Sequence, residues 1–151
     1  TQMLPIGSKL KNAMACIGPS VGWSILKLAF DSLATTMTFS IEQLGEIDNV
    51  VGKWCVARVP PELKSQIDHD YEIDGQAVTL FEVRPMWRGA PGELTRNPFV
   101  RFRQAKTTGI WKIYWRRQTG KWELYAPAPT AKNLTVALAI VEADHHGCFF
   151  G

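Results

Sequence analysis

The chain is poor in the features that define several protein classes. Its 151 residues include only three cysteines, Cys16, Cys55 and Cys148, and no Cys-x-x-Cys pair. An odd number of widely separated cysteines argues against a disulfide scaffold and favours a reducing compartment, so we expect a cytoplasmic protein. No run of about 18 uncharged apolar residues occurs, and we therefore expect neither a membrane span nor a membrane partner.

Signatures of catalysis and cofactor binding are also missing. The Gly-Ala-Pro-Gly stretch at 89–92 lacks the helix and the Lys-Ser/Thr of a phosphate loop, and no Gly-x-Ser-x-Gly elbow occurs. The sequence Asp-His-His-Gly-Cys at 144–148 has no second ligand pair at zinc spacing, which favours a polar turn over a metal site. We predict no catalytic residue, no cofactor and no metal, and a binding domain rather than an enzyme.

The length suits one domain, preceded by an extension. We predict a helical extension over 1–36 and a single domain over 37–151. In the extension, 8–17 is expected to form a short helix, and a second, amphipathic helix is predicted from apolar residues at helical spacing: Trp23, Leu26, Phe30, Leu33 and Met37. Such a stripe favours packing on the domain or self-assembly into a homo-oligomer.

Two further helices are predicted at the ends of the domain. Ser40 and Gln43 have the spacing of a capping box, so a helix is expected from Ser40 to about Cys55. In the segment 133–143, apolar residues alternate with other residues as in a strand and also recur at helical spacing. Its alanines, and Thr130 or Asn133 as N-cap, favour a helix.

Between these helices the pattern indicates strands at 68–73, 76–83, 99–103, 110–116 and 121–125. Asp74-Gly75 predicts a type I′ hairpin turn between the first two. Three prolines and two glycines predict a long irregular loop over 84–98. The expected fold is α+β, a five-stranded antiparallel meander sheet with helices packed on one face.

The net charge of +3 conceals an uneven distribution. Residues 84–121 hold ten basic residues and one acid, Glu93, a net charge of +9, whereas 1–83 carries −4 and 122–151 carries −2. A block of one sign attracts anionic partners through its summed field, although a plain solvated face would have the same composition.

Period-two alternation divides the strand residues between two faces. The predicted core face carries Val100, Phe102, Trp111, Ile113, Trp115, Trp122 and Leu124. The predicted exposed face carries Phe99, Arg101, Arg103, Lys112, Tyr114, Arg116, Lys121, Glu123 and Tyr125. The second set combines cations with aromatic rings.

This combination suggests an anion-binding face. Cations neutralise phosphates, and exposed rings stack on bases for roughly 1–3 kcal/mol each. The candidate cations are Arg101, Arg103, Lys112, Arg116 and Lys121, and the candidate stacking residues are Tyr114 and Phe99. Nucleic acid is the leading partner. A protein partner is the alternative, because Asp68, Asp70 and Glu72 would give the same sheet an acidic edge. A third interpretation is that Arg and Lys merely protect exposed strands from aggregation.

A second candidate site lies in the predicted loop. Trp87, Arg88, Glu93 and Arg96 would form an enzyme pocket if the loop were concave. The single acid among cations favours a structural ion pair over a general base.

Several spaced blocks resemble the bacterial family called domain of unknown function 3024. They are Arg-Pro-Met-Trp at 84–87, Gly-Glu-Leu-Thr-Arg at 92–96, Gly-Ile-Trp-Lys-Ile-Tyr-Trp at 109–115 and Gly-Lys-Trp-Glu-Leu-Tyr at 120–125. The resemblance runs from about Met37 to the end and implies a small bacterial, cytoplasmic protein, without activity or catalytic residues to transfer. The chain departs from the family at 117–120, which reads Arg-Gln-Thr-Gly instead of an Asp-Arg-Asn-Gly-like turn. Residues 1–36 lie outside the shared region, as an upstream extension or an element acquired with a mobile gene.

Overall fold

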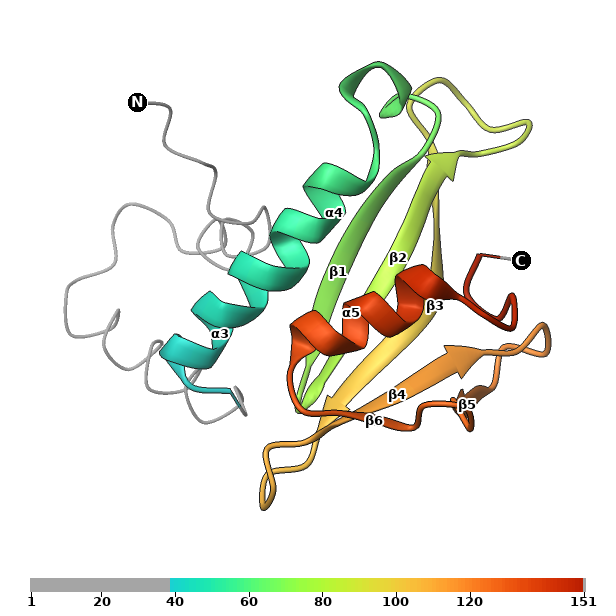
Figure 1. The fold of residues 1–151 in the computed structure, drawn as a ribbon. Coiled ribbons are helices and arrows are strands. Elements are labelled where there is room, and N and C mark those ends of the chain that lie inside the picture. Colours follow the sequence, from blue (N-terminus) through green and yellow to red (C-terminus); the bar gives the residue numbers. More distant parts are fainter. Residues whose placement is uncertain (1–38, 151) are drawn as a thin grey trace, which may run out of the picture.

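The computed structural model describes residues 39–150, as helices packed on an antiparallel sheet (Figure 1). The helical elements are α3 (Ile41–Ile47), the π-helical turn η1 (Asp48–Gly52), α4 (Lys53–Arg58), the 3₁₀ turn η2 (Pro61–Leu63) and α5 (Leu134–Ala143). The strands are β1 (Asp68–Asp74), β2 (Ala77–Pro85), β3 (Leu94–Gln104), β4 (Trp111–Arg116), β5 (Trp122–Leu124) and β6 (Thr130–Ala131). The two helices predicted within 1–36, and the self-assembly expected of them, lie outside the described residues and stay predictions.

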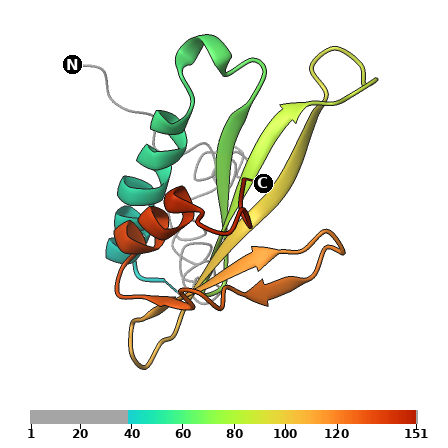
Figure 2. The ribbon, with the colours of Figure 1, turned by 45° about the vertical axis from the view of Figure 1, so that its right-hand side comes forward.

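The sheet confirms the predicted meander. Strands β1 to β5 are neighbours in chain order and pair antiparallel, and β6 adds a short pairing to β4 beyond the end of β5. Helices α3, α4 and α5 all lie on one face of this sheet (Figures 1 and 2). We call the side of the sheet that faces the helices the inner face and the opposite side the outer face.

The core lies between the inner face and the helices. Leu80, Phe102 and Ile113 of the sheet are fully buried, as are Ile47 before η1 and Leu134 at the start of α5. Each such side chain stabilises the fold by roughly 1.5–3 kcal/mol through its removal from water. The inner face is therefore the side of the sheet whose burial stabilises the fold.

The predicted helix starts are confirmed. Ser40 Oγ accepts the Gln43 backbone N–H at 3.2 Å, while Gln43 Oε1 accepts the Ser40 N–H at 2.9 Å. These two bonds satisfy amide groups at the beginning of α3 that have no partner within the helix. At α5, the Asn133 side chain accepts the Val136 N–H at 2.9 Å, which selects Asn133 over Thr130 as N-cap.

The first hairpin turn falls one residue later than predicted. Asp74 still pairs with Ala77, so the two loop residues are Gly75 and Gln76. Gly75 has a φ of 57° and Gln76 does not have a positive φ, whereas a type I′ turn requires positive values at both positions. The predicted type I′ turn is therefore wrong.

The long loop predicted over 84–98 is also wrong, because β2 continues to Pro85 and β3 begins at Leu94. Only 86–93 connects the two strands. Two of the three prolines that suggested a loop occupy places where a strand tolerates them. Pro85 is the last residue of β2, and Pro98 pairs with Phe81 directly beside a β-bulge.

That bulge changes the direction of the side chains in β3. Phe81 pairs with Pro98 and Leu80 pairs with Val100, which leaves Phe99 as an extra residue. A bulge interrupts the alternation of faces. Phe99 consequently lies on the inner side next to His69, at 5.7 Å between ring centroids, and its predicted outward position is wrong.

The predicted faces of β5 are reversed. Arg116 pairs with Trp122 and Tyr114 pairs with Leu124, so Trp122 and Leu124 share the outer face with the cations of β4. Tyr125, predicted to be outside, is buried in the core at 2% exposure. Five residues lie between Arg116 and its partner Trp122. Because this number is odd, the even-numbered residues of β5 lie on the same face as the even-numbered residues of β4.

The carboxylate of Asp144 fixes the path of the chain after α5 through three backbone hydrogen bonds. Asp144 ends the helix in the left-handed conformation, at φ 34°. Its carboxylate accepts the backbone N–H groups of Cys148 at 2.8 Å, Phe149 at 3.2 Å and Phe150 at 2.9 Å. These bonds turn the chain back so that Phe149 is buried against Tyr125, with ring centroids 5.0 Å apart.

We expect Asp144→Ala to lower the free energy of unfolding by about 2 kcal/mol, because three amide groups lose a charged acceptor and alanine is strained in the left-handed region. Asp144→Asn should cost clearly less, since asparagine tolerates this conformation and keeps one acceptor oxygen. Urea unfolding measures both. An Asp144→Ala protein as stable as the parent would contradict this account of the C-terminal turn.

Candidate anion-binding face

The outer face of β3, β4 and β5 carries most of the predicted binding residues. Register pairs Arg103 with Lys112 and Arg101 with Tyr114. Arg116 pairs with Trp122 one strand further. Antiparallel partners point to the same side of a sheet, so these six side chains form three neighbouring pairs on the outer face. Lys112, Arg103 and Arg116 are exposed.

A hollow of about 400 Å³ lies on this face. It is lined by Asp74, Gly75, Gln76, Ala77, Arg101, Arg103, Tyr114 and Trp122. The turn between β1 and β2 and the strand β5 thus border one space, although β3 and β4 lie between β2 and β5 in the sheet. The coiling of a twisted sheet brings such distant elements closer together on one face.

Arg101 is fixed in the hollow by neutral groups. Its Nε donates to Thr79 Oγ1 at 3.0 Å, and its guanidinium carbon lies 4.7 Å from the centroid of the Trp122 ring. Thr79 is itself 4% exposed, so the acceptor of this partly buried bond is shielded from water. Among residues 39–150, neither Arg101 nor Arg103 forms an ion pair. Both positive charges are uncompensated within that part of the chain.

The acidic edge on β1 has a different arrangement. Arg96 of β3 donates to Asp70 Oδ2 at 2.7 Å and to Glu72 Oε2 at 3.4 Å, and it lies 4.3 Å from the centroid of the Phe81 ring. This cation therefore balances part of the acidic edge that the sequence predicted. The cations of β3 and β4 nearer the hollow have no such partner among the described residues.

The four residues of the predicted loop pocket are spread over the β2–β3 hairpin. Trp87 is 86% exposed in the connecting loop, and Glu93 accepts the Ala90 N–H at 3.0 Å within that loop. Arg88 adopts a left-handed φ of 63°, and Arg96 forms an ion pair with Asp70 of β1. None of the four lines either hollow that we describe for residues 39–150.

Sequence reasoning placed one candidate binding residue, Phe99, on the wrong face and missed six residues at the hollow. Phe99 packs inside, between His69 and Phe150, and Lys121 lies in the turn before β5, away from the lining of the hollow. The hollow has five lining residues that were missed, and Thr79, which accepts the Arg101 hydrogen bond, is the sixth; the five are Asp74, Gly75, Gln76, Ala77 and Trp122. The odd length of the loop before Trp122 was the available signal for its outward position.

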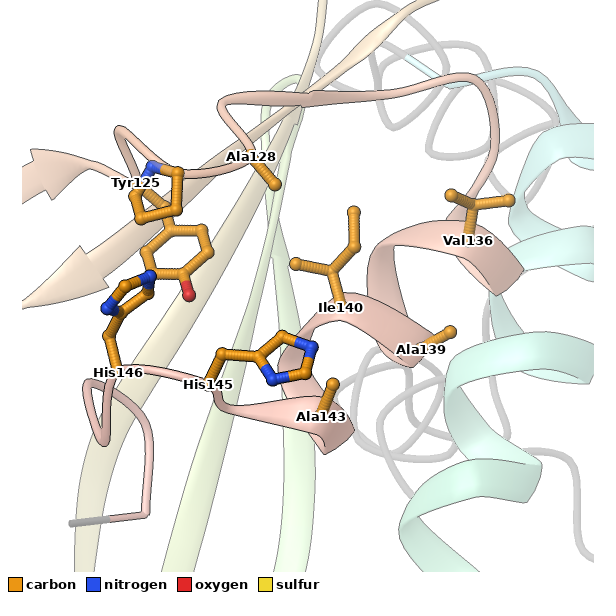
Figure 3. A pocket seen from close by; sticks show the side chains of 9 residues that line it. Tyr125, Ala128, Val136, Ala139, Ile140, Ala143, His145 and His146 are labelled. Carbon is orange, nitrogen blue, oxygen red and sulfur yellow. The ribbon is translucent and has the colours of Figure 1, made fainter.

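A second hollow, of about 350 Å³, lies between α5 and the chain after β5 (Figure 3). Its walls are mainly apolar, with Val136, Ala139 and Ile140 on the helix, Tyr125 and His146 across from them, and His145 just beyond the end of the helix. Burial raises the pKa of the Tyr125 hydroxyl. In residues 39–150, no three His, Cys, Asp or Glu side chains come together as a metal site would require.

These features define an α+β domain with helices on one face of an antiparallel meander and a hollow with two arginines on the other. The chain belongs to the family named domain of unknown function (DUF3024), whose model matches residues 39–151. Comparison with curated proteins and with solved structures finds no significant match. Within 39–150, none of the helices has the length and apolar character needed to cross a membrane.

His69 has the environment of a neutral core residue. It is 9% exposed, with its ring edge-on to Trp54 at 5.5 Å and to Phe99 at 5.7 Å, and neither ring nitrogen has a hydrogen-bond partner among the described groups. Burial, followed by the nearby Arg58 charge, lowers its pKa from 6.5. The folded state therefore resists protonation at this position.

We expect the free energy of unfolding to fall as the pH drops below about 6.5, because the unfolded chain then binds a proton that folded His69 excludes. His69→Phe should remove this part of the pH dependence. Urea unfolding at pH 7.5 and pH 5.0 measures it, with the exposed His145→Gln as control. A His69→Phe protein that loses as much stability on acidification as the parent would contradict the assignment.

Proposed function

We propose that this domain is a non-enzymatic binding module whose outer face holds single-stranded nucleic acid along β3, β4 and β5. The observation that carries the proposal is the state of Arg101. It is fixed by the Thr79 hydroxyl and the Trp122 ring, and no carboxylate of residues 39–150 neutralises it. A cation held in place and left without a counter-charge favours an anionic ligand, since the ligand supplies the missing charge.

The rings favour a single strand over a duplex. Tyr114 and Trp122 border the same hollow as Arg101 and Arg103. Base stacking on protein rings requires unpaired bases, and proteins that bind single strands combine such rings with a basic groove. An acidic protein would satisfy the cations but would leave this alternation of rings and charges unused. It is therefore the second candidate partner.

We place the protein in the bacterial cytoplasm, and the resemblance of the sequence supports this. The state of Cys55 is compatible with a reducing environment. Its thiol is buried and free of disulfide, and burial raises its pKa to about 12, so the reactive thiolate scarcely forms. For the extension 1–36, acquisition with a mobile gene is the origin that we propose.

Binding should depend steeply on salt. If the four cations Arg101, Arg103, Lys112 and Arg116 each neutralise a phosphate, the logarithm of the association constant should fall against that of salt concentration with a slope of about −3. Fluorescence anisotropy with a ten-nucleotide oligouridylate measures the slope between 50 and 200 mM salt. Each substitution Arg103→Ala or Lys112→Ala should weaken binding and make the slope less negative by about 0.7.

Lys53→Ala is the matched control, because Lys53 is an exposed cation on α4, on the inner side of the sheet. It changes the net charge by the same amount and should leave affinity and slope close to those of the parent. Absence of binding at 50 mM salt would contradict the proposal. An equal loss in Lys53→Ala would assign any binding to net charge and would contradict a site on the outer face.

A further inference from the structure

We propose, resting on the function proposed above, that the outer-face hollow seats one ribonucleotide unit and makes the domain prefer RNA to DNA. In this assignment Arg101 and Arg103 bind the phosphate, and the carboxylate of Asp74 accepts hydrogen bonds from the ribose hydroxyls.

The hollow has cations on one side and an acid on the other. Asp74 pairs with Ala77 across the β1–β2 hairpin, and Ala77 pairs with Arg103 across β2 and β3. Asp74 and Arg103 are thus two strand spacings apart, about 10 Å along the sheet. No ion pair joins Asp74 to Arg101 or Arg103, although all three line the same hollow.

Ala77 accounts for the open space between them. Its side chain is a single methyl group, and its row on the outer face has Asp74 on one side and Arg103 on the other. A longer side chain here would extend outward from the sheet and occupy the middle of the hollow. The small residue instead leaves a floor on which a ligand can contact both sides at once.

The cationic side is suited to a phosphate. The Nε of Arg101 is used by Thr79, which leaves the two terminal amino groups of its guanidinium to donate. Contact with the Trp122 ring restricts the guanidinium further. Little side-chain entropy remains to be lost on binding, and paired N–H donors match two phosphate oxygens. Arg103, exposed beside it, adds a second charge.

The acidic side requires a different group. An ionised carboxylate only accepts hydrogen bonds, and it repels phosphate. A ligand that satisfies both sides therefore carries an anion and, a few ångströms away, hydroxyl or amino donors. A ribonucleotide unit has both groups, and the 2′-hydroxyl is the donor that a deoxyribonucleotide lacks. Asp74 is thus the residue that would distinguish the two sugars.

The test compares a ten-nucleotide oligouridylate with the oligodeoxyuridylate of the same length, which differ only at the 2′ position. Anisotropy titrations at 50 mM salt should give about tenfold tighter binding of the RNA, the contribution expected of one hydrogen bond to a charged group. Asp74→Ala should bring the ratio of the two affinities close to one, without weakening the binding of DNA.

Two further variants separate the explanations. In Asp74→Asn, asparagine also favours turns and keeps one acceptor oxygen, so the ratio of RNA affinity to DNA affinity should fall only in part. Glu72→Gln, two residues earlier on the same strand and face, removes an equal charge. It should strengthen the binding of both oligonucleotides alike and leave the ratio unchanged.

The outcomes distinguish this inference from the function on which it rests. Equal affinity of the parent protein for RNA and DNA would overturn the inference and leave the proposed binding function intact. A preference for RNA that persists in both Asp74 variants would have the same consequence. Binding of neither oligonucleotide would contradict the proposed function itself. A ratio that falls as much in Glu72→Gln as in Asp74→Ala would assign the preference to general charge and would also overturn the inference.

Discussion

Between Leu80 and Phe81 of β2, the partner strand β3 contains one residue more than the ladder needs, and that residue is Phe99. Because side chains alternate along a strand, one extra residue reverses the face of everything that follows it. Arg96 before the bulge and Arg101 after it consequently both point outward. Without the bulge, one of these charges would face the hydrophobic core, where an unpaired cation costs several kcal/mol.

The bulge thus allows one strand to serve two electrostatic tasks on the same face. Before it, Arg96 reaches the acids of β1 and closes the edge of the sheet with ion pairs. After it, Arg101 contacts the neutral groups Thr79 and Trp122, and neither Arg101 nor Arg103 forms an ion pair among the described residues. Phe99 itself turns inward and packs with His69 and Phe150. The inner face provides hydrophobic stabilisation. On the outer face, the charges of Arg101 and Arg103 have no counter-charge among the described residues.

Much of this architecture follows from local patterns in the sequence. The capping box at Ser40, the apolar spacing of the helices and the order of the strands predicted the α+β meander, because each reflects interactions within a few residues. The face assignments of β4 were also sound, since Trp111 and Ile113 are buried while Lys112 is exposed.

The errors arose where pairing between strands decides the outcome. Nothing local marks Phe99 as an extra residue, because a bulge is defined by the partner strand. Trp122 begins the short strand β5 and Tyr125 directly follows it, and hydrophobicity alone does not decide which of these two aromatic residues enters the core. The loop length between β4 and β5 decides it. The hollow was equally hidden, since Asp74, Arg103 and Trp122 come from three distant parts of the chain.

The most direct test of the central claim is to observe which face an oligonucleotide touches. In an NMR titration with ten-nucleotide oligouridylate, we predict that the indole N–H signal of Trp122 and the Nε–H signal of Arg101 shift together with the backbone amide of Lys112. The indole of Trp54, which donates to Glu142 on the inner side, should stay in place. Shifts centred on Trp54 and α5, with Trp122 unchanged, would contradict an outer-face site.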